Sequence, residues 1–291
     1  MVWNVTLCIL ALLPLINKGS SGATAPLDPW LINGKIRPVD ILSNLNLQQK
    51  MAVTAPDGPV VVLAGPGSGK TRVITARVAY LIQQMGVRPY QILVVTFTNK
   101  AARELEKRVM QLAEGALVPG EPLPKMGTFH AICAQIMRRE AEYLPVDRDF
   151  VIFDADDQLT LVKRALKDLN IDEKLYKPSG VHSAISMAKN EKILPKEYLS
   201  YAAGGANRQG VNRNRDNVIA RIYVKYQEML QFNNAVDFDD LLLYTCRLLE
   251  QNIEVREKYS RRYQYILVDE FQDTNAVQYE LLKLLTSTHQ N

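Results

Sequence analysis

Two short segments of this 291-residue chain carry residues that could bind and hydrolyse a nucleotide. The first, residues 64–71, reads AGPGSGKT, a glycine-rich turn followed by a lysine and a threonine. The second, residues 266–273, reads ILVDEFQD, an apolar run that ends in two carboxylates. A glycine-rich turn lets backbone N–H groups surround phosphate oxygens, and paired carboxylates can hold a cation and activate water. Together the two segments, about 200 residues apart, predict nucleotide hydrolysis.

The glycine-rich segment predicts a specific division of labour around a triphosphate. We expect Lys70 to neutralise the β- and γ-phosphates and the hydroxyl of Thr71 to ligate Mg²⁺. Ala64 stands where the strict pattern has its first glycine, at a position that only opens the turn. The remaining loop residues would surround the phosphates with their backbone, namely Gly65, Pro66, Gly67, Ser68 and Gly69.

The carboxylate pair of the second segment has two interpretations. In the catalytic one, Asp269 holds Mg²⁺, mostly through water, and Glu270 polarises the attacking water toward the γ-phosphate. In the structural one, the pair only marks a helix terminus, since an apolar run that ends in Asp-Glu is common by itself. The phosphate loop upstream favours the catalytic interpretation.

The elements that must position these residues follow from the spacing of apolar residues. Residues 59–63 and 92–97 are short apolar runs typical of strands buried in a parallel sheet, and a third strand spans residues 263–267. The pattern after the glycine-rich turn predicts a helix that ends near Gly86. The alternation of strands and helices predicts an α/β fold, a P-loop NTPase with a parallel sheet flanked by helices.

Two features between the motifs leave alternatives open. Phe97 ends a predicted strand at the edge where ligands bind in such folds, and it could be core or could stack on an unpaired base. A compact P-loop domain also needs about 100 fewer residues than separate the motifs. The surplus predicts an inserted, mainly helical subdomain over residues 129–235, with helical patterns at 131–143, 156–169 and 218–232.

The composition is that of an ordinary globular protein, with 47% hydrophobic and 23% charged residues. The formal net charge is only +4, so any nucleic-acid-binding surface must be local. Cys8, Cys133 and Cys246 lie far apart without metal-ligand spacing. They predict free thiols in a reducing compartment, consistent with a cytoplasmic location.

Residues 2–16 are mostly apolar and have several interpretations. The run is short for a membrane span and no lysine or arginine precedes it, so a signal or anchor is disfavoured. A non-native leader, a start assigned too early or a short packing segment are the favoured alternatives. Residues 1–43 as a whole are interpreted as a leader and linker.

Six segments in this order resemble motifs of the first half of UvrD/Rep-like superfamily 1 DNA helicases. They are residues 45–53, 64–72, 95–102, 127–130, 236–242 and 268–275. The resemblance covers about residues 44–288. It implies a RecA-like ATP-binding domain made of residues 44–128 and 236–291, with residues 129–235 as the inserted helical subdomain.

The resemblance also implies roles that chemistry alone leaves open. Gln49 would pair with the donor and acceptor edge of adenine, and Arg72 would lie near the base or sugar. Phe97 would stack on single-stranded DNA, and Gln272 would link the γ-phosphate region to the DNA site. Candidates for contacts to the DNA backbone are Thr98, Asn99, Thr128 and His130.

The function implied is that of an ATP- and Mg²⁺-dependent 3′-to-5′ DNA helicase. In full-length form it would couple ATP hydrolysis to movement along single-stranded DNA and unwinding at junctions with duplex DNA, in repair or replication. In the family a second RecA-like domain supplies arginine fingers, and no such segment follows Asn291 in this sequence. We therefore expect this chain alone to bind ATP–Mg weakly and to hydrolyse ATP near the background rate.

Three other functions are compatible with parts of the sequence. The chain could be a nucleotide-gated nucleic-acid-binding fragment that never hydrolyses ATP. It could also be the motor half of a helicase–nuclease, which would require a nuclease domain downstream. A secreted or membrane-anchored protein is suggested only by residues 2–16.

Overall fold

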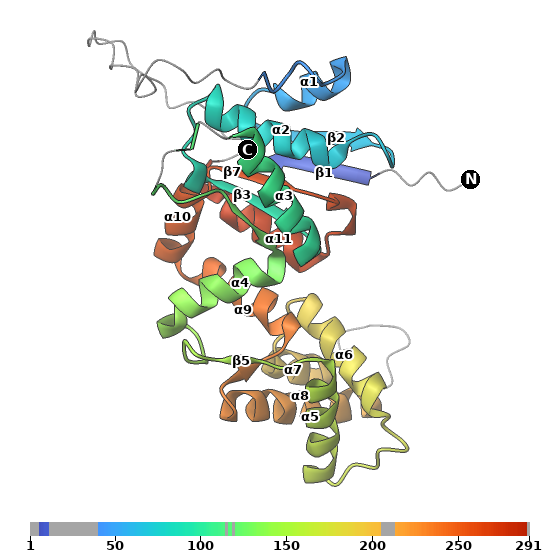
Figure 1. Cartoon of the computed structure of the whole chain (residues 1–291). Coiled ribbons are helices and arrows are strands. Elements are labelled where there is room, and N and C mark those ends of the chain that lie inside the picture. Colours follow the sequence, from blue (N-terminus) through green and yellow to red (C-terminus); the bar gives the residue numbers. More distant parts are fainter. Residues whose placement is uncertain (1–5, 12–39, 114–115, 118–119, 205–212, 290–291) are drawn as a thin grey trace. The chain divides into compact units, whose positions relative to one another are not determined.

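The computed structural model describes residues 6–11, 40–113, 116–117, 120–204 and 213–289 (Figure 1). The chain divides into two compact units. The nucleotide unit comprises Met1–Phe129, Glu257–Thr274 and Leu285–Asn291, and the helical unit comprises His130–Arg256 and Asn275–Leu284. The domain division expected from the sequence stays a prediction, because compactness alone does not define an independently folding domain.

Five strands form the sheet of the nucleotide unit, in the order β2-β1-β7-β3-β4. Strand β3 is parallel to β4 and to β7, whereas β1 pairs antiparallel with both β2 and β7. The predicted α/β fold with a parallel sheet flanked by helices is confirmed, and β1 is the exception to the parallel order among the described strands. The strands are β1 (Thr6–Ala11), β2 (Pro59–Ala64), β3 (Ile92–Thr96), β4 (Lys125–Thr128) and β7 (Tyr265–Val268).

Strand β1 belongs to the apolar N-terminal run. Thr6 is the register partner of Ala64 in β2, and Ile9 is the partner of Val268 in β7. Residues 6–11 therefore pair within the sheet, as expected for a short packing segment. The rest of the expected leader, residues 1–5 and 12–39, lies outside the described residues. Within the described ranges, every helix is too short or too polar to cross a membrane.

Two helices supply most of the core of the nucleotide unit. Helix α2 (Lys70–Gln83) and helix α3 (Asn99–Leu112) present apolar residues at three- and four-residue spacing, the pattern of a helix with one buried face. These residues pack against β3 and β7 in one cluster, which includes Ile74, Val78, Leu81, Ile92, Val94, Leu105, Val109 and Leu267. The apolar periodicity read from the sequence thus fixes which side of each helix faces the sheet.

Helix α1 (Leu47–Val53) is held to α2 by a buried arginine. Arg77 is 1% exposed, and its guanidinium donates a hydrogen bond of 2.6 Å to the carbonyl of Val53 at the end of α1. Burial lowers the pKa of Arg77, although the nearby Asp57 opposes this. The contact joins the helix that carries Gln49 to the helix that begins with Lys70.

Short elements connect the main strands and helices of this unit. The 3-10 helix η1 (Pro89–Gln91) leads into β3, and α10 (Ile253–Arg262) leads into β7. After β7 the chain forms η3 (Phe271–Asp273), and η4 (Ser287–His289) lies near the C-terminus.

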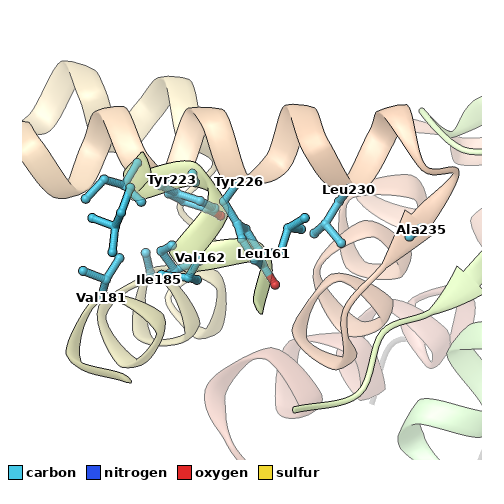
Figure 2. Packing of buried hydrophobic residues seen from close by; sticks show 12 residues of the cluster. Leu161, Val162, Val181, Ile185, Tyr223, Tyr226, Leu230 and Ala235 are labelled. Carbon is cyan, nitrogen blue, oxygen red and sulfur yellow. The ribbon is translucent and has the colours of Figure 1, made fainter. Parts of the chain in front are cut away.

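The helical unit consists mainly of packed helices. Its core is formed by α5, α6 and α8, where Leu161, Val162, Val181, Tyr223 and Tyr226 meet (Figure 2). The described elements are α4 (Phe129–Arg139), η2 (Ala141–Tyr143), β5 (Val151–Ile152), α5 (Ala155–Asp168), α6 (Pro178–Asn190), α7 (Pro195–Gly204), α8 (Arg213–Phe232), β6 (Ala235–Val236), α9 (Phe238–Gln251) and α11 (Ala276–Leu285).

A buried cluster of charges fixes the start of α9. The ammonium of Lys189, at the end of α6, lies 2.6 Å from Asp237 and 2.7 Å from Asp240. Asp237 caps α9, since its carboxylate accepts the N–H of Asp240 at 2.8 Å, and Tyr226 donates to Asp237 at 2.9 Å. Burial and the neighbouring Asp237 raise the pKa of Asp240 to about 6. Lys189 therefore offsets two carboxylates that would otherwise be uncompensated in the interior.

The two cysteines with described side chains are also in the helical unit. Cys133 and Cys246 are buried free thiols, as the sequence predicts. Burial raises the pKa of each to about 12, so both remain protonated and unreactive near neutral pH.

Candidate nucleotide and nucleic-acid sites

The glycine-rich loop connects β2 to α2 and lies at the carboxyl end of β2. Gly67 and Gly69 have φ values of +76° and +89°, in the left-handed region that favours glycine. A Cβ atom at Gly69 would lie 2.9 Å from the side-chain nitrogen of Gln49. The positive φ therefore favours glycine at this position, immediately before the first residue of α2, and a Cβ atom there would also displace the end of the Gln49 side chain.

Lys70 and Glu270 meet across this site. Their ammonium and carboxylate groups are 3.7 Å apart, with side-chain exposures of 14% for Lys70 and 38% for Glu270. Lys70 begins α2, whereas Glu270 follows β7 with a left-handed φ of 51°. The two motifs recognised about 200 residues apart in the sequence therefore meet at one edge of the sheet.

Asp269 directly follows β7 and is 7% exposed. Its N–H donates to the carbonyl of Val95 at 2.9 Å, and its carboxylate accepts the N–H of Glu270 at 3.1 Å. Burial and the adjacent Glu270 carboxylate raise the pKa of Asp269. A carboxylate in this environment suits a hard divalent cation, because the positive charge would favour its ionised form.

Gln272 extends the polar contacts from Glu270 along the chain. Its side-chain amide donates to Glu270 at 2.7 Å and to Asp273 at 3.3 Å. Lys70, Glu270 and Gln272 are thus connected through the Glu270 carboxylate. Gln272 contacts the residue expected to orient water, and its predicted link to DNA stays a prediction.

Gln49 lies against the phosphate loop. Its side-chain nitrogen donates to the carbonyl of Ser68 at 2.9 Å. Its side-chain oxygen accepts the N–H of Asn46 at 3.1 Å, which completes a capping box at the start of α1. Sequence reasoning did not anticipate that both ends of this amide bond within the protein. Recognition of adenine by Gln49 stays a prediction, as does the base or sugar contact of Arg72, the third residue of α2.

The DNA-contact candidates of the nucleotide unit lie near the carboxyl ends of β3 and β4. The ring of Phe97 meets that of Phe129 edge-on, with centroids 6.0 Å apart. Thr98 caps α3 by accepting the N–H of Ala101 at 3.1 Å, and Asn99 is the exposed first residue of that helix. Thr128 ends β4 as the register partner of Thr96. These candidates share one edge of the sheet, but Thr98 also has a structural role as a cap.

In the helical unit, His130 meets an aromatic residue that was not among the candidates. Its ring packs edge-on against Phe238, with centroids 5.7 Å apart, and Phe238 is 46% exposed. Burial lowers the pKa of His130, although Asp239 opposes the shift, so the imidazole is neutral near pH 7. The signal for Phe238 in the sequence was an aromatic residue directly after an aspartate that caps a helix.

Comparison with known proteins identifies the family that this sequence matches. The UvrD/REP helicase N-terminal domain profile matches residues 45–291. The chain is 45% identical over 251 residues to the ATP-dependent DNA helicase PcrA of Bacillus subtilis (strain 168), covering 86% of this chain and 32% of that protein. It is 42% identical over 251 residues to PcrA of Staphylococcus aureus (strain NCTC 8325 / PS 47), covering 86% and 33%.

The chain therefore spans about a third of the length of the curated relatives it matches. The match extends over nearly all the described residues outside β1 and includes both the phosphate loop and the carboxylate pair. On this basis the chain belongs to the UvrD/REP helicase N-terminal domain family.

Proposed function

We propose that this chain is the ATP- and Mg²⁺-binding portion of an ATP-dependent DNA helicase of the UvrD/Rep type. The observation that carries the proposal is the Lys70–Glu270 pair, 3.7 Å apart at the glycine-rich loop. There the Lys70 ammonium, which would neutralise phosphate charge, lies beside the Glu270 carboxylate, which would activate water. Lys70 begins the helix after β2 and Glu270 follows β7, so both lie at the same edge of the sheet. The similarity to two ATP-dependent DNA helicases supports the same function.

Each residue of the nucleotide site has a separate role in the proposed ATP hydrolysis. The loop N–H groups and the start of α2 bind phosphate oxygens, and Lys70 neutralises charge on the β- and γ-phosphates. Thr71 and Asp269 would hold Mg²⁺, which supplies positive charge to the phosphates when bound. Glu270 orients and polarises the attacking water, and Gln272 holds the Glu270 carboxylate through a 2.7 Å hydrogen bond.

Single-stranded DNA is the proposed nucleic-acid ligand. Phe97 would stack on a base, while Thr98, Asn99, Thr128 and the neutral His130 would contact the sugar–phosphate backbone. Such binding is independent of base sequence, since stacking and phosphate contacts read no base edge. It should also weaken as salt concentration rises.

In the full-length protein, ATP hydrolysis would drive movement along one strand in the 3′-to-5′ direction and unwinding at duplex junctions, in repair or replication. We further propose that the full-length protein contains a second RecA-like domain, which would complete the ATP site with arginine side chains. The threefold greater length of the relatives supports this assignment.

Nucleotide and DNA binding by the chain test the proposal. We expect fluorescent ATP to bind in the presence of Mg²⁺, and Lys70→Ala to weaken that binding tenfold or more, roughly the loss of a charged hydrogen bond. The same substitution at the exposed Lys163 of α5 serves as the control. Equal affinity in all three proteins, or no binding of oligo-dT by the unmodified chain, would contradict the proposal.

A further inference from the structure

Asn190, the last residue of α6, contacts the first turns of two other helices in the helical unit. Its side-chain nitrogen donates to the carboxylate of Asp239 in α9 at 3.1 Å. Its side-chain oxygen accepts a hydrogen bond of 2.9 Å from the amide of Asn275, which precedes α11. A single carboxamide therefore joins residues that are 49 and 85 positions away in the sequence.

The α9 end of this connection lies at a predicted DNA contact. Asp239 is adjacent in sequence to Phe238, whose ring packs against His130. The Asp239 carboxylate is also close enough to His130 to raise its pKa against the effect of burial. A shift of the first turn of α9 would therefore change the surroundings of the His130 ring.

Asn275, at the α11 end of this connection, is close in sequence to residues of the predicted γ-phosphate site. Asn275 caps α11, with its oxygen accepting the N–H of Gln278 at 2.9 Å and its own N–H donating to Gln278 at 3.1 Å. The cap uses the Asn275 side-chain oxygen and leaves its amide nitrogen to donate to Asn190. Residues 270–274, which include Glu270 and Gln272, immediately precede this cap. Only residues 271–274 separate Glu270 from Asn275 in the sequence.

Both bonds of Asn190 require a carboxamide. Its oxygen must accept from Asn275 while its nitrogen donates to Asp239, and the same nitrogen also donates to the Ser186 carbonyl at 2.8 Å. An aspartate could accept but not donate, and it would place a second negative charge beside Asp239. An alanine could do neither. Asn190→Asp therefore removes the bond to Asp239 and keeps the acceptor for Asn275, whereas Asn190→Ala removes both bonds.

We propose that Asn190 is a positioning residue that couples the segment following Glu270 to the His130–Phe238 ring pair. Occupancy of the nucleotide site shifts the cap of α11, and Asn190 passes the shift to the first turn of α9. The inference rests on the proposed function for nucleotide binding, but not on DNA binding.

Hydrogen exchange of the 291-residue chain, with and without Mg²⁺ and adenylyl imidodiphosphate, tests the coupling. In the unmodified chain we expect the nucleotide to change exchange severalfold in peptides covering both 237–242 and 275–280. In Asn190→Asp the change at 275–280 should persist and that at 237–242 should fall to less than half. Asn190→Ala should also lose the change at 237–242.

Asn233→Ala is the matched control, because the Asn233 amide is exposed and donates to the Met229 carbonyl four residues earlier, at 2.6 Å. It should respond to nucleotide like the unmodified chain.

If Asn190 has only a structural role, its substitution should change hydrogen exchange in the absence of nucleotide but leave the nucleotide-dependent difference at residues 237–242 intact. That result, or no response at 237–242 in the unmodified chain, would overturn the inference. Failure of the chain to bind the nucleotide, measured in the same samples, would overturn the proposed function and this inference with it.

Discussion

Glu270 has a backbone conformation that glutamate seldom adopts, with φ at 51°. A residue that is neither glycine nor asparagine costs about 1 kcal/mol or more in this region, and such strain is retained where the surroundings enforce it. Here the enforcing contacts are the bond from its own N–H to Asp269 and the bond from Gln272 to its carboxylate. In this conformation the carboxylate lies within 3.7 Å of Lys70.

A first prediction concerns the chemistry of this carboxylate. In the full-length enzyme, Glu270→Gln should lower the kcat for ATP by about 10²-fold or more, the usual contribution of a general base. Nucleotide affinity should change little, because the amide keeps the shape of the side chain. Steady-state ATPase assays with saturating oligo-dT measure the effect. Unchanged turnover would remove Glu270 from the role of activating water.

A second prediction concerns Gly69. Gly69→Ala should weaken binding of Mg²⁺–ATP by about tenfold or more, because the new methyl group meets Gln49 at 2.9 Å and the backbone must leave φ +89°. Gly67→Ala controls for backbone strain within the same loop, since Gly67 has φ +76° and nothing within 4 Å of the position that a new methyl group would take. Fluorescence titration of both variants separates the two effects. Equal affinities in the two variants would show that contact with Gln49 does not matter.

At the residue scale, the sequence predicted the phosphate loop and carboxylate pair because each motif is local and its chemistry depends on adjacent residues. It did not predict the internal bonds of Gln49, one of which joins residues 19 positions apart. Nor did it identify Asn190, whose partners are 49 and 85 positions away. Such contacts depend on how helices pack, which apolar periodicity does not specify.

At the scale of elements, strand β4 was missed, whereas strands β2, β3 and β7 were predictable from buried apolar runs and helices α2, α4, α5 and α8 from apolar periodicity. The antiparallel β1 was not, because a short apolar segment carries no information about its pairing direction. The start of α9 was only partly predictable. Residues 236–242 were identified as a segment that resembles a family motif, but the Lys189 ammonium that offsets the charges of Asp237 and Asp240 comes from α6.

A third prediction follows from this charge cluster. Burial and Asp237 raise the pKa of Asp240 to about 6, so Asp240 favours folding most below its ordinary pKa near 4, and this contribution is lost as pH rises through 6. The free energy of unfolding of the unmodified chain minus that of Asp240→Asn should therefore decrease between pH 4 and 7. The change should be up to about 3 kcal/mol, at 1.36 kcal/mol per pKa unit.

Urea denaturation followed by circular dichroism at several pH values measures this change. The lowered pKa of Asp237, held down by Lys189 against the effect of burial, acts in the opposite sense and only below pH 4. Asp168→Asn, at an exposed position of α5, controls for the loss of one negative charge. A pH-independent difference between the unmodified chain and Asp240→Asn would contradict the raised pKa.

At the scale of the whole molecule, the chain spans about a third of the length of the curated relatives it matches. A fourth prediction follows from the proposed function, in which a second RecA-like domain supplies arginine fingers. The 291-residue chain by itself should hydrolyse ATP near the background rate with or without oligo-dT, because arginine fingers contribute about 10³–10⁵ in rate in related phosphoryl transfer. Phosphate-release assays that compare the chain with the full-length protein measure the difference. Robust DNA-stimulated turnover by the chain alone would contradict it.

The sheet order also has a consequence for synthesis on the ribosome. Strand β3 lies between β4 and β7, yet β4 ends at Thr128 and β7 begins at Tyr265. At translation rates of about 5–20 residues per second, the intervening residues take roughly 7–27 s to appear. The helices of residues 130–256 thus emerge while one edge of β3 still lacks its neighbour. A nascent chain stalled before Tyr265 would hold an exposed apolar strand edge, which is prone to aggregation unless a chaperone covers it.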